Sequence, residues 1–119
     1  MKEKDITPIV LRSMRDDARF GSCAVEIKIC KGKTLSWTAL KEHQRRALEL
    51  AGNRMYYKIP DDSIGQKPFD AFILKKSEAY LVIYFAIKHN ECWAIPIEKV
   101  PTGSIGIDCA RENGIKVIL

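Results

Sequence analysis

The chain has 119 residues, a formal net charge of +5, and hydrophobic residues at 46% of its positions. This length suits one domain with a single packed core, and no apolar run approaches the roughly 18 residues that indicate a membrane span. The first residues, MKEKD, lead into no apolar signal segment, so we expect a cytoplasmic protein. The positive charge favours contact with a polyanion such as nucleic acid, although many small basic proteins bind none.

The cysteines do not follow the spacing of a zinc site. There is no C-x-x-C pair, and neither of the two histidines stands near a cysteine at a ligand spacing. We therefore expect free thiols in a reducing compartment. The residues concerned are Cys23, Cys30, Cys92, Cys109, His43 and His89.

The N-terminal third predicts a helix followed by a strand. Thr7 is a suitable N-cap and Pro8 a suitable first helical residue, which predicts a helix from Pro8 to about Asp17. Residues 22–30 then alternate as in a half-buried strand. One face of that strand carries Val25, Ile27 and Ile29, and the other carries Ala24, Glu26, Lys28 and Cys30.

A second helix is predicted from Trp37 to about Ala51, with Ser36 as its cap and Gly52-Asn53 at its end. Most of the remaining chain reads as strands. The predicted strands are 54–59, then a hairpin of 69–74 with 79–86, then 92–97, and a last hairpin of 104–110 with 114–119. Residues 79–86 are almost all apolar, which indicates a strand buried on both faces at the centre of the sheet. This order predicts one α+β domain with a central mixed sheet and two flanking helices.

Glu26 and Lys28 are the strongest candidates for chemistry. Residues two apart on a strand share a face, so a carboxylate and an ammonium lie roughly 7 Å apart on one side of a half-buried strand. Metal-assisted phosphodiester hydrolysis uses such a pair, because the carboxylate can hold Mg²⁺ and the lysine can act on water or phosphate. The alternative is an ordinary Glu–Lys pair on a solvated strand face.

Two further polar residues stand in apolar surroundings. Gln44 follows Leu40 by four residues and so falls within the apolar stripe of the second predicted helix. A position beside the Glu26 strand would give its amide partners, although a helix-flank amide bonded to backbone is the alternative. Asp70 begins a predicted strand directly after Pro68-Phe69, where it can supply a second metal ligand or simply cap a turn.

The sequence AVEIK at 24–28, a short basic loop, and LKEHQ at 40–44 resemble a known pattern. The pattern is the E-x-K strand and following H-Q helix of Holliday-junction resolvases in the PD-(D/E)XK nuclease superfamily. This resemblance covers residues 22–60 and implies a restriction-endonuclease-like fold. It also implies that Glu26 is a ligand of Mg²⁺ or Mn²⁺, that Lys28 is the catalytic lysine, and that Gln44 is an active-site helix residue.

One part of the family's pattern is displaced. In that superfamily an aspartate precedes the E-x-K strand on the partner strand of a hairpin, whereas here a helix precedes residue 22. Asp70 begins the only similar segment, which lies downstream. Either the site is rearranged, with Glu26 and Asp70 as its metal ligands, or it is degenerate and has kept the fold without the metal.

Basic residues gather near these positions in sequence and suit contacts to the phosphates of a duplex, although a solvated charged surface explains each one singly. They are Lys31, Lys33, Lys41, Arg45, Arg46, Lys75 and Lys76. Three hypotheses follow. The first is a Mg²⁺-dependent DNA endonuclease that acts on branched or duplex DNA, either as a monomer or as a homodimer. The second is an inactive relative that binds nucleic acid or a protein partner as a regulator. The third is an α+β domain in which Glu26 and Lys28 only pair on the surface.

Overall fold

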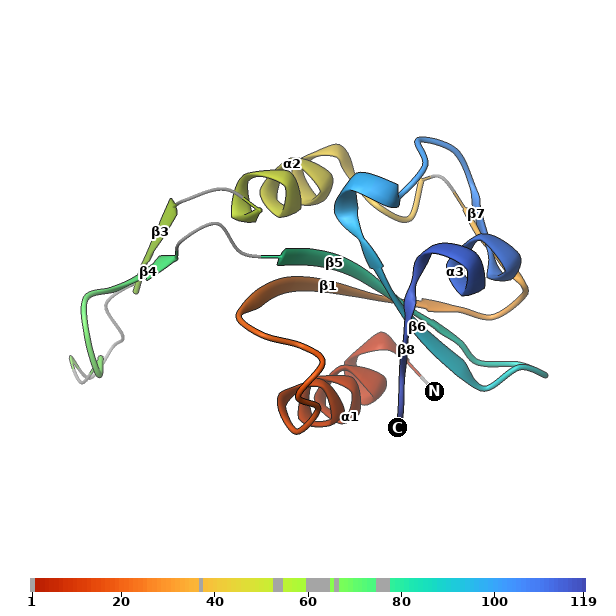
Figure 1. Cartoon of the computed structure of the whole chain (residues 1–119), viewed down its shortest axis with the longest axis horizontal. Helices are drawn as coiled ribbons and strands as arrows, with labels where there is room; N and C mark the ends of the chain where they lie inside the picture. Colours follow the sequence, from red (N-terminus) through yellow and green to blue (C-terminus); the bar gives the residue numbers. More distant parts are fainter. Residues whose placement is uncertain (1, 37, 53–54, 60–64, 66, 75–77) are drawn as a thin grey trace.

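Four strands form the central sheet of the protein in the order β1, β5, β6, β8 (Figure 1). They are β1 (Cys23–Cys30), β5 (Glu78–Phe85), β6 (Glu91–Pro96) and β8 (Ile115–Val117). The computed structural model describes residues 2–36, 38–52, 55–59, 65, 67–74 and 78–119. Within these residues, the protein is an α+β domain with three α-helices, this mixed sheet and two small two-stranded sheets.

Strand β5 is the centre of the sheet, as its apolar sequence predicts. Seven of its eight residues are buried, and it pairs in parallel with β1 and antiparallel with β6. The predicted hairpin of residues 69–74 with 79–86 is wrong. A strand that is apolar on both faces is best buried between two other strands, and the segment before it pairs elsewhere.

Helix α1 (Glu3–Arg15) covers one face of the sheet. Its buried residues Ile6, Val10 and Met14 pack in one cluster with Ile27 of β1 and with alternate residues of β5. The helix begins before Thr7, so the predicted start at Pro8 is wrong. Acidic residues occupy its first turn, where the Asp5 carboxylate accepts a hydrogen bond from the backbone N–H of Lys2 at 2.9 Å.

The opposite face is covered by α2 (Glu42–Ala51), the short 3-10 turn η1 (Ile97–Lys99) and α3 (Ile107–Asn113). A two-stranded sheet of β2 (Thr34–Leu35) and β7 (Ile105–Gly106) leads into α3. The predicted hairpin of residues 104–110 with 114–119 is therefore wrong, because Ile107 and Ala110 are spaced for a helix face and are both buried. The second helix begins at Glu42, and Trp37 lies outside the described residues.

The central sheet and the helices packed on it form what we call the body. A hairpin between α2 and β5 extends away from this body (Figure 1). Its strands β3 (Met55–Lys58) and β4 (Ala71–Leu74) pair antiparallel, from Met55 opposite Leu74 to Lys58 opposite Ala71. We call the described residues between 55 and 74 the arm.

Two global properties follow from the described residues. Over that part of the chain, no helix has both the length and the apolar composition needed to cross a membrane. All four cysteines are described, and all four are free thiols.

Candidate functional site

Glu26 and Lys28 project from β1 toward the face that α2 covers. Their strand neighbours Ala24 and Cys30 pack in the cluster on that face, whereas Ile27 packs in the cluster under α1, so the predicted alternation is confirmed. Lys28 Nζ lies 3.5 Å from Glu26 Oε1, and the two side chains are 13% and 31% exposed. The pair is thus half-buried, which weakens screening by solvent and strengthens its interaction relative to a surface pair.

Gln44 joins this pair from α2. Its Nε2 donates a hydrogen bond to Glu26 Oε1 at 3.0 Å, while its Oε1 accepts one from the backbone N–H of Lys41 at 3.0 Å. The amide therefore caps the start of α2 and at the same time fixes the Glu26 carboxylate on β1. The predicted position of Gln44 beside the Glu26 strand is confirmed.

The donor set of this cluster is small. Glu26 offers a carboxylate whose Oε1 already accepts a hydrogen bond from Gln44 and forms an ion pair with Lys28, and the oxygen of Gln44 is occupied by helix capping. Mg²⁺ takes oxygen ligands, keeps several waters, and is often bound through one or two carboxylates together with substrate phosphates. The single carboxylate of Glu26, beside the ammonium of Lys28, is the smallest number of protein ligands in a Mg²⁺ site of that kind.

Asp70 lies elsewhere, immediately before β4 of the arm. Its carboxylate is 95% exposed and lies 3.4 Å from Lys67 Nζ, and its carbonyl accepts a hydrogen bond from the N–H of Ile59 at 2.8 Å. The arm lies apart from β1 in Figure 1, so the structure does not bring Asp70 to Glu26 within one chain. The described residues contain no group of three or more His, Cys, Asp or Glu side chains placed to hold a metal.

The predicted phosphate-binding residues divide into three groups. Lys31, Lys33 and Lys41 are exposed. Arg46 is also exposed and pairs with Glu42 of the same helix at 3.3 Å. Arg45 is used differently, because its guanidinium donates to the carbonyls of Val100 at 3.3 Å and Pro101 at 2.7 Å and so fastens α2 to the segment after η1. Lys75 and Lys76 lie outside the described residues.

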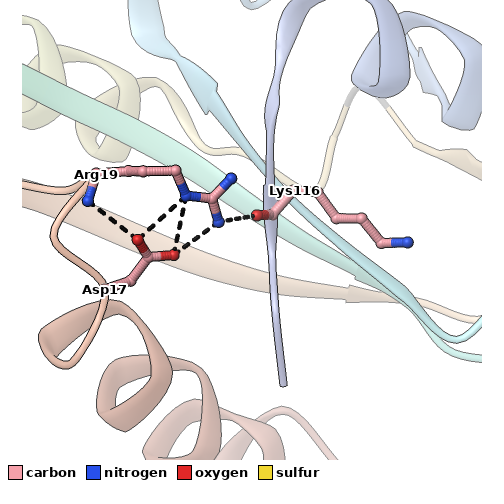
Figure 2. A network of polar contacts seen from close by, with 3 residues as sticks. All are labelled: Asp17, Arg19 and Lys116. Carbon is pink, nitrogen blue, oxygen red and sulfur yellow. Dashed lines mark hydrogen bonds and ion pairs between the residues drawn. The ribbon is translucent and has the colours of Figure 1, made fainter.

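Two polar clusters were not predicted. Arg19 donates to both oxygens of Asp17 and, through Nη2, to the carbonyl of Lys116 at 2.7 Å, which ties the segment after α1 to β8 (Figure 2). Glu91 accepts hydrogen bonds from Arg111 at 2.9 and 2.5 Å and from Trp93 Nε1 at 3.0 Å. The arginine first and the indole second lower the pKa of Glu91 to about 2. Both clusters join segments that are distant in sequence, so no local sequence motif predicts them.

Comparisons with models of known protein families, with curated proteins and with solved structures give no match to this chain.

Proposed function

We propose that this protein is a metal-dependent DNA endonuclease, acting on branched or duplex DNA, with Glu26, Lys28 and Gln44 in its active site. One observation carries the proposal. A carboxylate, an ammonium and an amide meet in a half-buried position, from a strand and from the helix that follows it. The same residues carry the resemblance to the E-x-K strand and H-Q helix of resolvases, so spacing and geometry support one assignment.

In this proposal each side chain has a separate task. The Glu26 carboxylate would hold Mg²⁺ or Mn²⁺, which when bound would supply positive charge for the scissile phosphate and a more acidic water. Lys28 orients the attacking water and donates to the developing oxyanion. Gln44 keeps the carboxylate in place through its 3.0 Å hydrogen bond. Lys31, Lys33, Lys41 and Arg46 supply phosphate contacts that position DNA without reading its bases.

A second candidate is an inactive protein of the same fold that binds nucleic acid or a protein partner. The carboxylate of Asp70 favours it, because it is exposed and paired with Lys67 on the arm, and the arm lies apart from β1 (Figure 1). A lone carboxylate beside an ammonium binds a divalent cation weakly, because the lysine already neutralises the charge.

The experiment compares cleavage of supercoiled and branched DNA in Mg²⁺ and in Mn²⁺ by wild type, Glu26→Gln and Lys28→Met. We expect each variant to lose at least about 100-fold in rate while keeping its affinity for DNA, because each removes one charge from the reacting centre. Glu98→Gln and Lys99→Met make the same changes at exposed positions on η1 and serve as matched controls.

Each result separates the candidates. Cleavage that survives both active-site substitutions assigns the activity to another site or to a contaminant. Binding of DNA without cleavage by wild type favours the inactive candidate. Absence of both binding and cleavage contradicts both candidates as DNA-acting proteins.

A further inference from the structure

Strand β1 has an open edge. It pairs with β5 on one side, and within the described residues no strand pairs with its other side. The strand is eight residues long and carries Glu26 and Lys28. An uncovered strand of this length presents a row of backbone N–H and C=O groups that can accept another strand.

The arm is suited to such an edge, because it is a two-stranded hairpin with exposed apolar side chains. A two-stranded hairpin alone is at best marginally stable in water and needs a further strand or a packing surface. Phe72 and Ile73 are neighbours on β4, so their side chains point to opposite faces of the arm, and they are 50% and 73% exposed. Neither Phe72 nor Ile73 belongs to a core cluster of the described residues. Both faces of the arm therefore expose apolar surface.

The arm cannot reach its own β1 in this arrangement, because it extends away from the body (Figure 1). A second copy removes this difficulty. In a two-fold dimer, each arm can lie on the β1 edge of the other copy, and the same pair of surfaces is used twice. The exposed apolar side chains of the arm and the open edge of β1 are then both covered.

We propose that the arm of one copy docks on the open β1 edge of a second copy, and that its Asp70 completes the site at Glu26 and Lys28. The second part rests on the function proposed above. Asp70 immediately precedes β4, so a β4 strand paired with β1 carries this carboxylate to the edge where Glu26 stands. The completed site would then offer two carboxylates, beside Lys28, to hold a divalent cation.

The docking is tested by sedimentation over a concentration series, without metal or DNA. Wild type is expected to form a dimer, and Phe72→Ser with Ile73→Ser is expected to weaken it at least tenfold, because apolar surface is lost from the interface. Ile87→Ser with Ile118→Ser, at exposed positions outside the arm, is the matched control and is expected to remain dimeric. Thermal unfolding checks that both variants fold. A monomeric wild type, or a dimer that the arm variant leaves intact, overturns the docking.

The shared site is tested by complementation between Glu26→Gln and Asp70→Asn, co-expressed with two different tags. Each variant alone is expected to be inactive. A heterodimer with exchanged arms contains one intact site, so random pairing restores about a quarter of wild-type cleavage. An inactive mixture beside an active wild type overturns the shared site. An inactive wild type instead refutes the nuclease function and leaves the docking to be decided by sedimentation alone.

Discussion

Strands β5 and β4 have similar apolar sequences and opposite environments. Residues 79–85 of β5 are all buried between two neighbouring strands and two helical layers. On β4, Phe72 and Ile73 are exposed. An apolar run therefore specifies that a segment must be buried, but not which surface buries it. In β5 the chain supplies that surface itself, whereas we propose that a second copy supplies it to the arm.

The largest effect is expected from a matched pair of truncations in the two regions. Phe85→Ala is expected to lower the free energy of unfolding by about 3–5 kcal/mol, because it leaves a cavity in a fully buried position. Phe72→Ala is expected to change it by less than about 0.5 kcal/mol in dilute monomer, where the side chain is exposed. Urea unfolding at low protein concentration measures both. Equal losses in the two variants would show that the arm is packed within its own chain.

A second effect tests how closely the body is packed around α3. A Cβ at Gly114 would lie 2.6 Å from the carbonyl oxygen of Ala110 and 3.1 Å from that of Ala94. Gly114→Ala is therefore expected to cost about 1–3 kcal/mol, since backbone atoms must shift to admit the methyl group. Gly103→Ala meets no atom within 4 Å and is the control, with an expected change of less than about 0.5 kcal/mol. An unchanged free energy of unfolding in Gly114→Ala would indicate that the backbone between α3 and β8 shifts at little cost.

The sequence predicts local periodicity well and long-range pairing poorly. Alternation assigned the two faces of β1, and the apolar run of residues 79–86 identified the central strand. The partner of that strand could not be predicted, because a short connection before it suggested a hairpin whereas burial favoured parallel pairing with β1. Residues 107–113 show the same limit, since a helical and an extended reading of a short segment differ little in propensity.

The candidate site shows what spacing can and cannot establish. Glu26, Lys28 and Gln44 come together because a strand and the next helix fix their relative positions over a short stretch of chain. Asp70 is predicted beside them from its place at the start of a strand and from the family's pattern, but neither feature states in which direction a hairpin between α2 and β5 extends. Arg45 shows a third case, because its charge suggested phosphate binding and its hydrogen bonds go to backbone carbonyls.

A smaller effect is expected from the polar connection that joins α2 to β1. Gln44→Leu removes both the cap of α2 and the hydrogen bond to Glu26, and we expect a loss of about 1–2 kcal/mol in the free energy of unfolding. His43→Leu changes the adjacent, exposed position of the same helix and is expected to be neutral. Thermal and urea unfolding measure the difference. A neutral Gln44→Leu would mean that neither bond contributes, and that the amide is not a positioning residue.

The smallest effect is expected from a comparison of two carboxylate ion pairs, one on the body and one on the arm. Arg111 and Trp93 hold the pKa of Glu91 at about 2, below its ordinary value of 4.5. A lowered pKa in the folded state means that the folded protein binds fewer protons than the unfolded chain between these values. The contribution of Glu91 is therefore complete above about pH 4.5 and is lost as the pH falls toward 2. Glu91→Gln should flatten the stability of the protein over this window. Asp70→Asn, in an exposed pair on the arm, should leave that part of the profile unchanged in dilute monomer. Acid unfolding curves of the two variants make the comparison, and a flattened curve for Asp70→Asn would place its carboxylate inside the folded body rather than on a free arm.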